Sequence, residues 1–147
     1  MHQSPNKILL IKRDKRPYKG YWSLIGGKML LEESFKEASL RQIKEKASLN
    51  GKYTSINGIM HERVKGEDVV KHSFILFFTK IKTNETKFIE TRHGELRWFP
   101  IKNIGKKEKI IPSDLWLIKN RLNNKIDVKT AKMLEKEGEL SNFKVLR

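Results

Sequence analysis

Apolar and polar residues follow one another along this chain in a pattern that predicts both strands and helices. The short apolar run 8–11 is typical of a strand. Segments 53–63 and 69–82 are expected to be strands, and the polar residues 65–68 between them indicate a hairpin-like turn. Within the second segment, residues 74–78 are almost all apolar, so we expect a central strand that is covered on both faces.

Two further segments have the spacing of amphipathic helices. Ser34, followed three residues later by Glu37, is a capping-box pattern, and nothing breaks a helix from there to Ala47. The apolar residues of this helix form one stripe, namely Leu40, Ile43 and Ala47. A second helix is expected over 115–122 after Pro112, with an inward stripe of Leu115, Ile118 and Leu122.

The first helix presents a polar face away from its apolar stripe, formed by Arg41, Gln42, Glu45 and Lys46. Carboxylates at positions 42, 45 and 46 would suit Mg²⁺ bridging substrate phosphates, because this cation prefers hard oxygen ligands. Here the three positions hold an amide, a carboxylate and an ammonium, which sum to no net charge. An amide binds Mg²⁺ weakly and a protonated ammonium does not bind it. The helix pattern alone also fits an ordinary solvated face.

The segment 26–49 resembles the Nudix box, G-x5-E-x7-R-E-U-x-E-E-x-G-U, in which U is a bulky aliphatic residue. The matching residues are Gly27, Glu33, Arg41, Ile43, Glu45 and Leu49. Three positions depart from the pattern, because Gln42 and Lys46 replace glutamates and Ser48 replaces a glycine. On either side, GYWSLIGG at 20–27 is similar to the family's G-x-W-x-L-P-G-G, and GELRWFP at 94–100 to its E-x-R-W-x-P strand.

The resemblance implies an α/β fold, the Nudix α/β/α sandwich with a mixed sheet between helices, over about residues 7–122. Members usually carry an apolar strand before the one that matches 8–11, and residues 1–6 are too short and polar to form it. Unless the chain starts late, the sheet lacks that strand and exposes an edge. A second copy covering this edge would make a homodimer.

The resemblance also implies roles for single residues. A Mg²⁺ or Mn²⁺ cofactor, weakly held, is expected at Glu45, Gly26 and Glu33. The residues expected to act in catalysis are Glu45, Arg41 and Glu95. Substrate contacts are expected from Lys46, Gln42, Lys28 and Trp22. For Glu95, a solvated glutamate at the start of a strand fits equally well. For Trp22, stacking on a base competes with burial in the core.

The reaction implied is attack of water on the phosphoanhydride of a nucleoside diphosphate linked to another moiety. Because two acids of the box are replaced, we expect this activity to be weak or to use an altered metal arrangement. The alternative is a non-catalytic module in which Lys46 supplies a fixed cation for nucleotide phosphates. No further motif selects one substrate.

Charge and composition add a third alternative. The formal net charge of +15 in 147 residues attracts phosphates and nucleic acids. The excess is mostly lysine scattered along the chain, without a basic helix that carries aromatic residues, so a nucleotide-type substrate is favoured over nucleic acid. The chain has no cysteine and no apolar run long enough to span a bilayer, which predicts a cytoplasmic protein without a membrane partner. We expect one domain over 1–147, with a charged, partly helical tail over 123–147.

Overall fold

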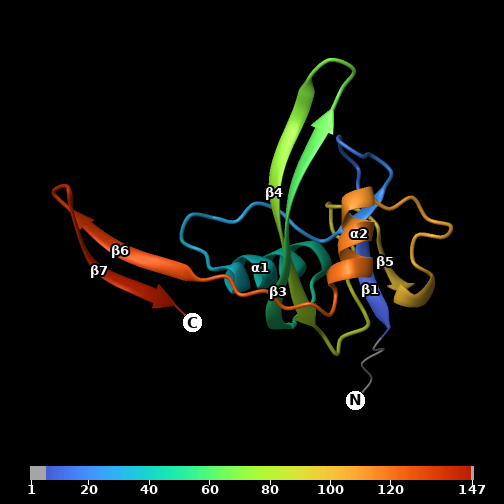
Figure 1. The fold of residues 1–147 in the computed structure, drawn as a ribbon. Coiled ribbons are helices and arrows are strands. Elements are labelled where there is room, and N and C mark those ends of the chain that lie inside the picture. The colour runs from blue at the N-terminus through green and yellow to red at the C-terminus, as the bar shows by residue number, and fades with distance from the viewer. Residues whose placement is uncertain (1–5, 147) are drawn as a thin grey trace.

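A computed structural model describes residues 6–146, which form a mixed α/β fold (Figure 1). In chain order the elements are β1 (Lys7–Lys12), β2 (Trp22–Leu24), α1 (Phe35–Ala47), β3 (Lys52–Lys65), β4 (Val70–Lys82), β5 (Leu96–Pro100), the short 3-10 helix η1 (Ile101–Asn103), α2 (Pro112–Arg121), β6 (Thr130–Lys136) and β7 (Glu139–Leu146). The strands and helices expected between residues 8 and 122 are therefore present, with small differences in their bounds.

The strand β1 is the middle of a three-stranded antiparallel sheet with the order β2-β1-β5. Leu10 lies opposite Leu24 of β2, and Leu9 lies opposite Trp98 of β5. Both edges of β1 are thus hydrogen-bonded, and an exposed edge of this sheet lies on β2 or β5. The family's usual first strand would precede β1, and residues 1–6 were expected to be too short and polar to form it. Residues 1–5 lie outside the described residues, so this expectation stays a prediction.

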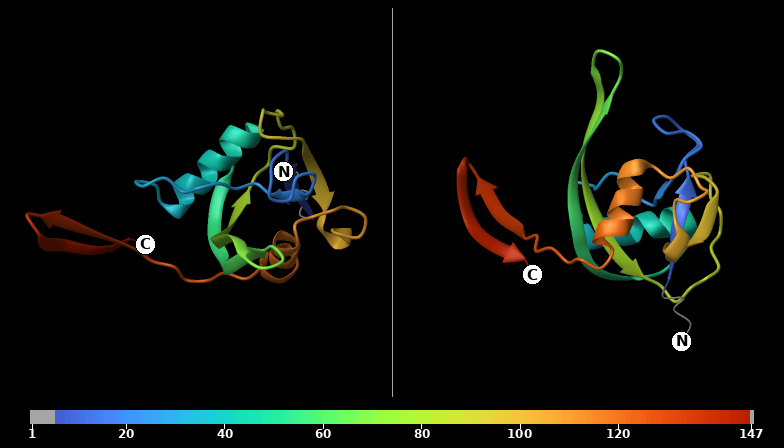
Figure 2. Two further views of the ribbon diagram at one scale, coloured as in Figure 1. Left: turned by 90° about the horizontal axis from the view of Figure 1, so that it is seen from above. Right: turned by 45° about the vertical axis from the view of Figure 1, so that its right-hand side comes forward.

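The two faces of this sheet are buried on different helices, because successive side chains of a strand point to opposite faces. The cluster on the α2 side contains Leu10, Trp22, Phe99, Ile104, Ile110 and Ile118. The cluster on the α1 side contains Ile11, Ala47, Leu49 and Leu96. The helices therefore enclose the sheet, and the predicted α/β/α sandwich is confirmed (Figure 2).

The long strands β3 and β4 form a separate antiparallel ribbon, whose inner half also lies between the helices. Gly58 faces Leu117 of α2, whereas the ring of Phe77 lies 4.7 Å from that of Phe35 in α1. The outer half extends beyond the domain (Figure 1). The expectation that residues 74–78 are covered on both faces was wrong, since Ile75 is 68% exposed and only Phe78 is buried. The ribbon is longer than the helices that pack on it, so its outer half is covered by neither helix.

The tail after residue 123 contains β6 and β7 and no helix among its described residues, so the prediction of a partly helical tail was wrong. Lys136 pairs with Glu139, which leaves Glu137 and Gly138 as a two-residue turn with φ of 53° and 82°. Positive φ at both turn positions matches the right-handed twist of a hairpin. Apolar residues recur before and after this turn, at positions 131, 133 and 134 and at positions 140, 143, 145 and 146.

Within residues 6–146, no helix is both long and apolar enough to cross a membrane. The cytoplasmic location stays a prediction.

Candidate functional site

The helix α1 begins where its sequence predicts. The Ser34 hydroxyl accepts a hydrogen bond from the Glu37 backbone N–H at 3.2 Å, and the Ser34 N–H donates to the Glu37 carboxylate at 2.7 Å. This reciprocal capping box fixes the start of the helix and hence the direction in which its later residues point. Positions 41 and 45, and 42 and 46, are each one turn apart on its surface.

The loop before α1 approaches the helix closely at Gly27. A Cβ atom on Gly27 would lie 2.5 Å from the Gln42 side-chain nitrogen, so only glycine fits here without displacing that side chain. Gln42 is only 8% exposed although the helical period places it on the polar face, and its expected contact with the substrate stays a prediction. Its amide nitrogen is 3.5 Å from the Lys28 carbonyl oxygen, and its Oε1 is buried without a hydrogen-bond donor among the described residues.

Arg41 joins two carboxylates and the loop. Its Nε and Nη2 donate to the two oxygens of Glu33, the second at 2.9 Å, and its Nη1 donates to Glu45 at 3.2 Å. Nη2 also donates to the Lys28 carbonyl oxygen at 3.0 Å. The guanidinium, together with the Leu30 N–H, lowers the pKa of Glu33 to about 2. The predicted contact between Arg41 and a box carboxylate is present, and its part in catalysis stays a prediction.

Lys46 lies where the resemblance places the cation. Its ammonium donates a hydrogen bond to the Gly26 carbonyl oxygen. Partial burial lowers the pKa of Lys46, and the nearby charges of Arg13 and Arg41 lower it further, while Glu45 opposes them. Arg13 is a residue that the sequence did not single out. It follows the end of β1, and no motif marks it as part of the site.

The side chains present do not fit a divalent cation held by several acids. Among residues 6–146, no group of three or more His, Cys, Asp or Glu is arranged to hold a metal. The Gly26 carbonyl accepts from an ammonium, and Glu33 and Glu45 both accept from the Arg41 guanidinium. The three residues expected to hold Mg²⁺ or Mn²⁺ are therefore each paired with a basic side chain.

The other expected site residues lie apart from this group or contribute differently. Glu95 contacts Arg97 at 3.2 Å and Lys12 at 3.8 Å, and no box residue is among its ion-pair partners. Trp22 is 5% exposed, and the Arg97 guanidinium lies 4.9 Å from its ring centre. This burial fits the alternative of a core residue, and contact of Trp22 with the substrate stays a prediction. Lys28 contributes its backbone carbonyl oxygen to the site.

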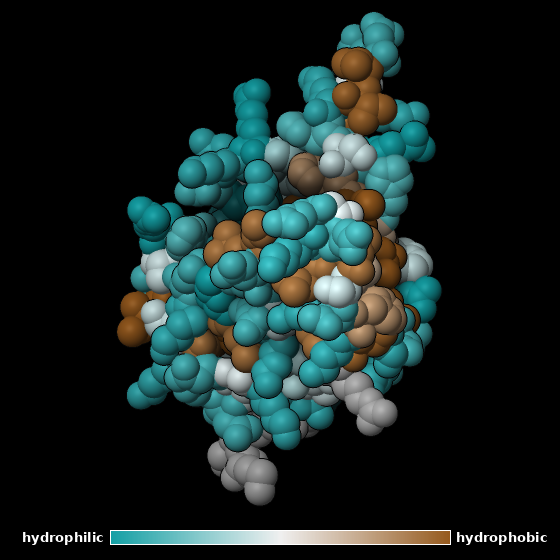
Figure 3. All heavy atoms as spheres, turned by 90° about the vertical axis from the view of Figure 1, so that its left-hand side faces the viewer, coloured by the Kyte–Doolittle hydropathy of each residue, from teal (hydrophilic) through white to brown (hydrophobic). Residues whose placement is uncertain are grey.

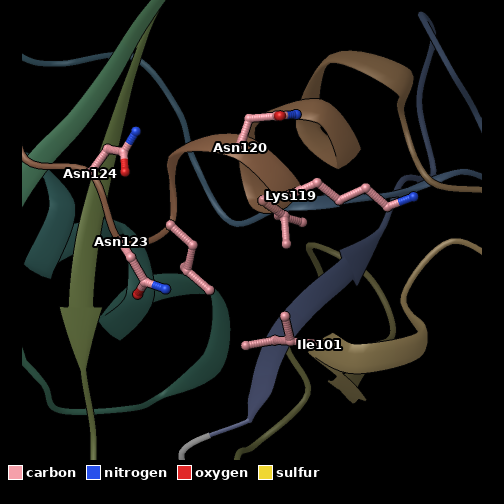
Figure 4. Close-up of a pocket in the computed structure, with 7 residues that line it drawn as sticks. Ile101, Lys119, Asn120, Asn123 and Asn124 are labelled. Carbon is pink, nitrogen blue, oxygen red and sulfur yellow. The ribbon is translucent and has the colours of Figure 1, made fainter.

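Two of the hollows on the surface of the described residues lie beside helices, and one of these two borders the box. It has a volume of about 790 Å³ and is lined by Leu30, Leu31, Glu32, Glu33, Glu37, Leu40 and Arg41. The other, of about 330 Å³, lies between η1 and the end of α2, and is lined by Ile101, Ile118, Lys119, Asn120, Leu122, Asn123 and Asn124 (Figure 4). Only the first has a size and a position suited to a ligand of the box residues.

One known relative shares a short stretch of sequence with this chain. A segment of 57 residues is 44% identical to the ADP-ribose pyrophosphatase of Methanocaldococcus jannaschii, and covers 39% of this chain and 34% of that protein. The matched segment thus spans about a third of the relative's length.

Two solved structures share the fold. The MutT protein from Bacillus halodurans has a TM-score of 0.67 at 22% identity, covering 95% of this chain and 90% of that one. The NUDIX domain of Shewanella oneidensis NrtR, complexed with ADP ribose, has a TM-score of 0.65 at 19% identity, covering 80% of this chain and 77% of that one. The family model of the NUDIX domain matches residues 1–119, which is most of the sequence, and the chain therefore belongs to the NUDIX domain family.

Proposed function

We propose that this protein binds a nucleoside diphosphate linked to a second moiety through Lys46, without a divalent cation. The observation that carries the proposal is the hydrogen bond from the Lys46 ammonium to the Gly26 carbonyl oxygen. An ammonium at this oxygen supplies a fixed positive charge where family members are expected to place a metal ion. Binding of phosphate then needs no added cation.

The charges around Lys46 favour an anion. Its pKa is lowered by partial burial and by the charges of Arg13 and Arg41, while Glu45 raises it, so two cations and one carboxylate act on this ammonium. Arg41 already donates to Glu33 and Glu45, which leaves Lys46 and Arg13 as the cations for a phosphate. Arg13 uses its Nε on the Pro17 carbonyl at 2.8 Å, and no described hydrogen bond uses its terminal nitrogens. A phosphate would relieve the repulsion between these two cations.

ADP-ribose is the first ligand to test. The Methanocaldococcus jannaschii relative is an ADP-ribose pyrophosphatase, and the Shewanella oneidensis structure contains ADP ribose. In this chain, the hollow beside the box has apolar walls from Leu30, Leu31 and Leu40, and its volume of about 790 Å³ is sufficient for a moiety beyond the diphosphate.

Slow hydrolysis of the phosphoanhydride is the second candidate, and the retained Glu33–Arg41–Glu45 group favours it. The roles of Glu45, Arg41 and Glu95 in such a reaction remain predictions. Removal of metal ligands or of a general base usually lowers rates by orders of magnitude. A measured rate near that of a typical enzyme, with kcat of about 10 s⁻¹, would refute the proposal of slow turnover.

The binding test is calorimetric titration of ADP-ribose in EDTA, with wild type, Lys46→Glu and Lys44→Glu. Lys44 is the matched control, because it lies on the same helix and donates to Asn50 at 3.2 Å, away from Gly26. We expect wild type to bind in EDTA and Lys46→Glu to bind at least about tenfold more weakly, a loss of about 1.4 kcal/mol. No binding in EDTA, or an equal loss in Lys44→Glu, would contradict the proposal.

The hydrolysis test adds Mg²⁺ or Mn²⁺ and compares wild type with the double variant Gln42→Glu/Lys46→Glu. Restoring both acids removes the ammonium from Gly26 and places carboxylates at the positions of the family pattern. We expect the double variant to be at least about 100-fold faster than wild type. If wild type is already fast and the double variant gains nothing, slow turnover is refuted, and so is the proposal that Lys46 takes the place of a metal ion.

A further inference from the structure

The last two strands form a hairpin that stands away from the rest of the protein. Strands β6 and β7 pair only with each other, and their turn projects away from the domain (Figures 1 and 2). The base of the hairpin lies near α1, because the charge of Lys132 acts on Glu37. A single two-stranded hairpin is at best marginally stable in water and normally needs a third strand or a packing partner. The isolation of this arm, residues 130–146, therefore calls for a surface to receive it.

One face of the arm is apolar. Ala131 lies opposite Val145, and the bulge between Lys132 and Leu134 turns Met133 and Phe143 toward this same face. Met133 is 57% exposed and Phe143 is 68% exposed, so the face has no cover within the described chain. The opposite face bears Lys132, Lys144 and Ser141, together with Leu134, which lies opposite Ser141 and is 51% exposed.

The receiving surface is present on the same chain. Where the β3–β4 ribbon leaves α1, Ile59 pairs with Phe77 and His61 pairs with Ile75, which puts three apolar side chains on the face toward α1. Phe77 is partly covered there by the Phe35 ring of α1, at 4.7 Å. Ile59, Ile75 and Phe77 are 51%, 68% and 43% exposed. Apolar side chains are visible between hydrophilic ones on the side from which the arm projects (Figure 3).

We propose that two copies of this chain exchange arms, the apolar face of each β6–β7 hairpin packing on Ile59, Ile75 and Phe77 of the other copy. Such an exchange is isologous, which means that both copies use the same surfaces. The two copies are related by a two-fold axis, both arms and both ribbons are buried, and no unpaired interface remains for a third copy. Exposed apolar side chains of this size each contribute roughly 60–100 Å². The four faces together then bury on the order of 1,000 Å², which is the lower bound for a specific interface.

Charge favours a second copy as the occupant. The arm contains three glutamates (135, 137, 139) and three lysines (132, 136, 144), so it is neutral, whereas the whole chain carries +15. The arm is thus a segment that can approach another basic copy without strong repulsion. The structural match with the Bacillus halodurans protein covers 95% of this chain, more than residues 1–129 could supply, so the match extends into the arm.

The first test measures mass by light scattering after size exclusion of the full chain, at concentrations up to about 100 µM. Phe143→Glu places a charge on the apolar face of β7, and Ser141→Glu places the same charge on its other face. We expect a dimer for wild type and for Ser141→Glu. Phe143→Glu and Ile75→Glu should each weaken dimerisation by about 100-fold, because a buried carboxylate is costly. A monomeric wild type, or equal effects of both β7 variants, would overturn the proposal.

A second test uses the absence of native cysteine. Phe143→Cys and Ile75→Cys chains are mixed and oxidised, and the linked products are separated on a non-reducing gel. We expect a disulfide between one chain of each kind. In the double variant, a link between two chains supports exchange, whereas a link within one chain shows that the arm packs on its own ribbon and overturns the proposal.

Discussion

Asp114 lies in the first turn of α2, where its Oδ2 accepts a hydrogen bond from the Leu24 N–H at 2.9 Å. The contact ties β2, and with it the loop that leads to Gly26, to a helix 90 residues later in the chain. The pKa of Asp114 is raised from 3.8 to about 6, mainly by burial and also by the charge of Glu62. The Leu24 N–H and Arg13 oppose this shift. The folded state with an ionised Asp114 is therefore destabilised, although the Leu24 N–H holds the carboxylate in place.

The size of that cost follows from the shift. About two pKa units at roughly 1.4 kcal/mol each give about 3 kcal/mol at pH 7. Because the folded state binds the proton more tightly than the unfolded state, stability from this group falls as pH rises from about 4 to about 6 and is constant above. Asp114→Asn removes the charge, and its amide oxygen can still accept from Leu24. The variant also loses the attraction between the carboxylate and the helix N-terminus, which offsets at most about 1 kcal/mol of the gain in stability.

We therefore expect Asp114→Asn to be about 2 kcal/mol more stable than wild type at pH 7, and to be about equally stable at pH 4. Urea unfolding between pH 4 and pH 8 measures both the gain and its pH dependence. Asp127→Asn is the control, since Asp127 is exposed and paired with Lys129 at 2.9 Å on the surface. A variant that is less stable than wild type at pH 7, or one that keeps the wild-type slope between pH 4 and 6, would refute the reasoning.

Two further predictions concern the fold. Ser34→Ala removes the side-chain acceptor of the capping box and should lower the free energy of unfolding by about 1 kcal/mol, measured in urea; no change would show that the cap does not hold α1. Leu10→Ala empties a side chain that is 0% exposed, and should cost about 2–5 kcal/mol in the same assay. A loss below about 1 kcal/mol would mean that the α2-side cluster closes around the gap.

Local rules predicted the parts of the fold that local interactions decide. The start of α1 depends on a hydrogen bond between residues three apart, and the strand at 8–11 depends on a short apolar run, so both are legible in the sequence. The spacing of Gly27, Glu33 and Arg41 likewise indicated which residues meet, because one helix and the loop before it carry them all.

The predictions that did not match the structure concern residues whose surroundings come from distant parts of the chain. An apolar run such as 74–78 is equally consistent with a covered strand and with a ribbon that extends past its helices. Gln42 belongs to the polar face by helical period, but the close approach of Gly27 buries it. Arg13 was missed because its relation to Lys46 arises only when β1 and α1 come together. The tail hairpin depends on a Glu137–Gly138 turn, which is a weaker signal than Asn-Gly or Asp-Gly.

The hydrogen bond between Lys46 and Gly26 also has a genetic consequence. Lysine and glutamine codons each differ from a glutamate codon in the first base alone. Of the two changes, only Lys46→Glu removes the ammonium that is hydrogen-bonded to the Gly26 carbonyl oxygen. The change Gln42→Glu replaces a neutral side chain with a charged one. The scaffold of this chain thus lies two point mutations from carboxylates at all three of the positions 42, 45 and 46.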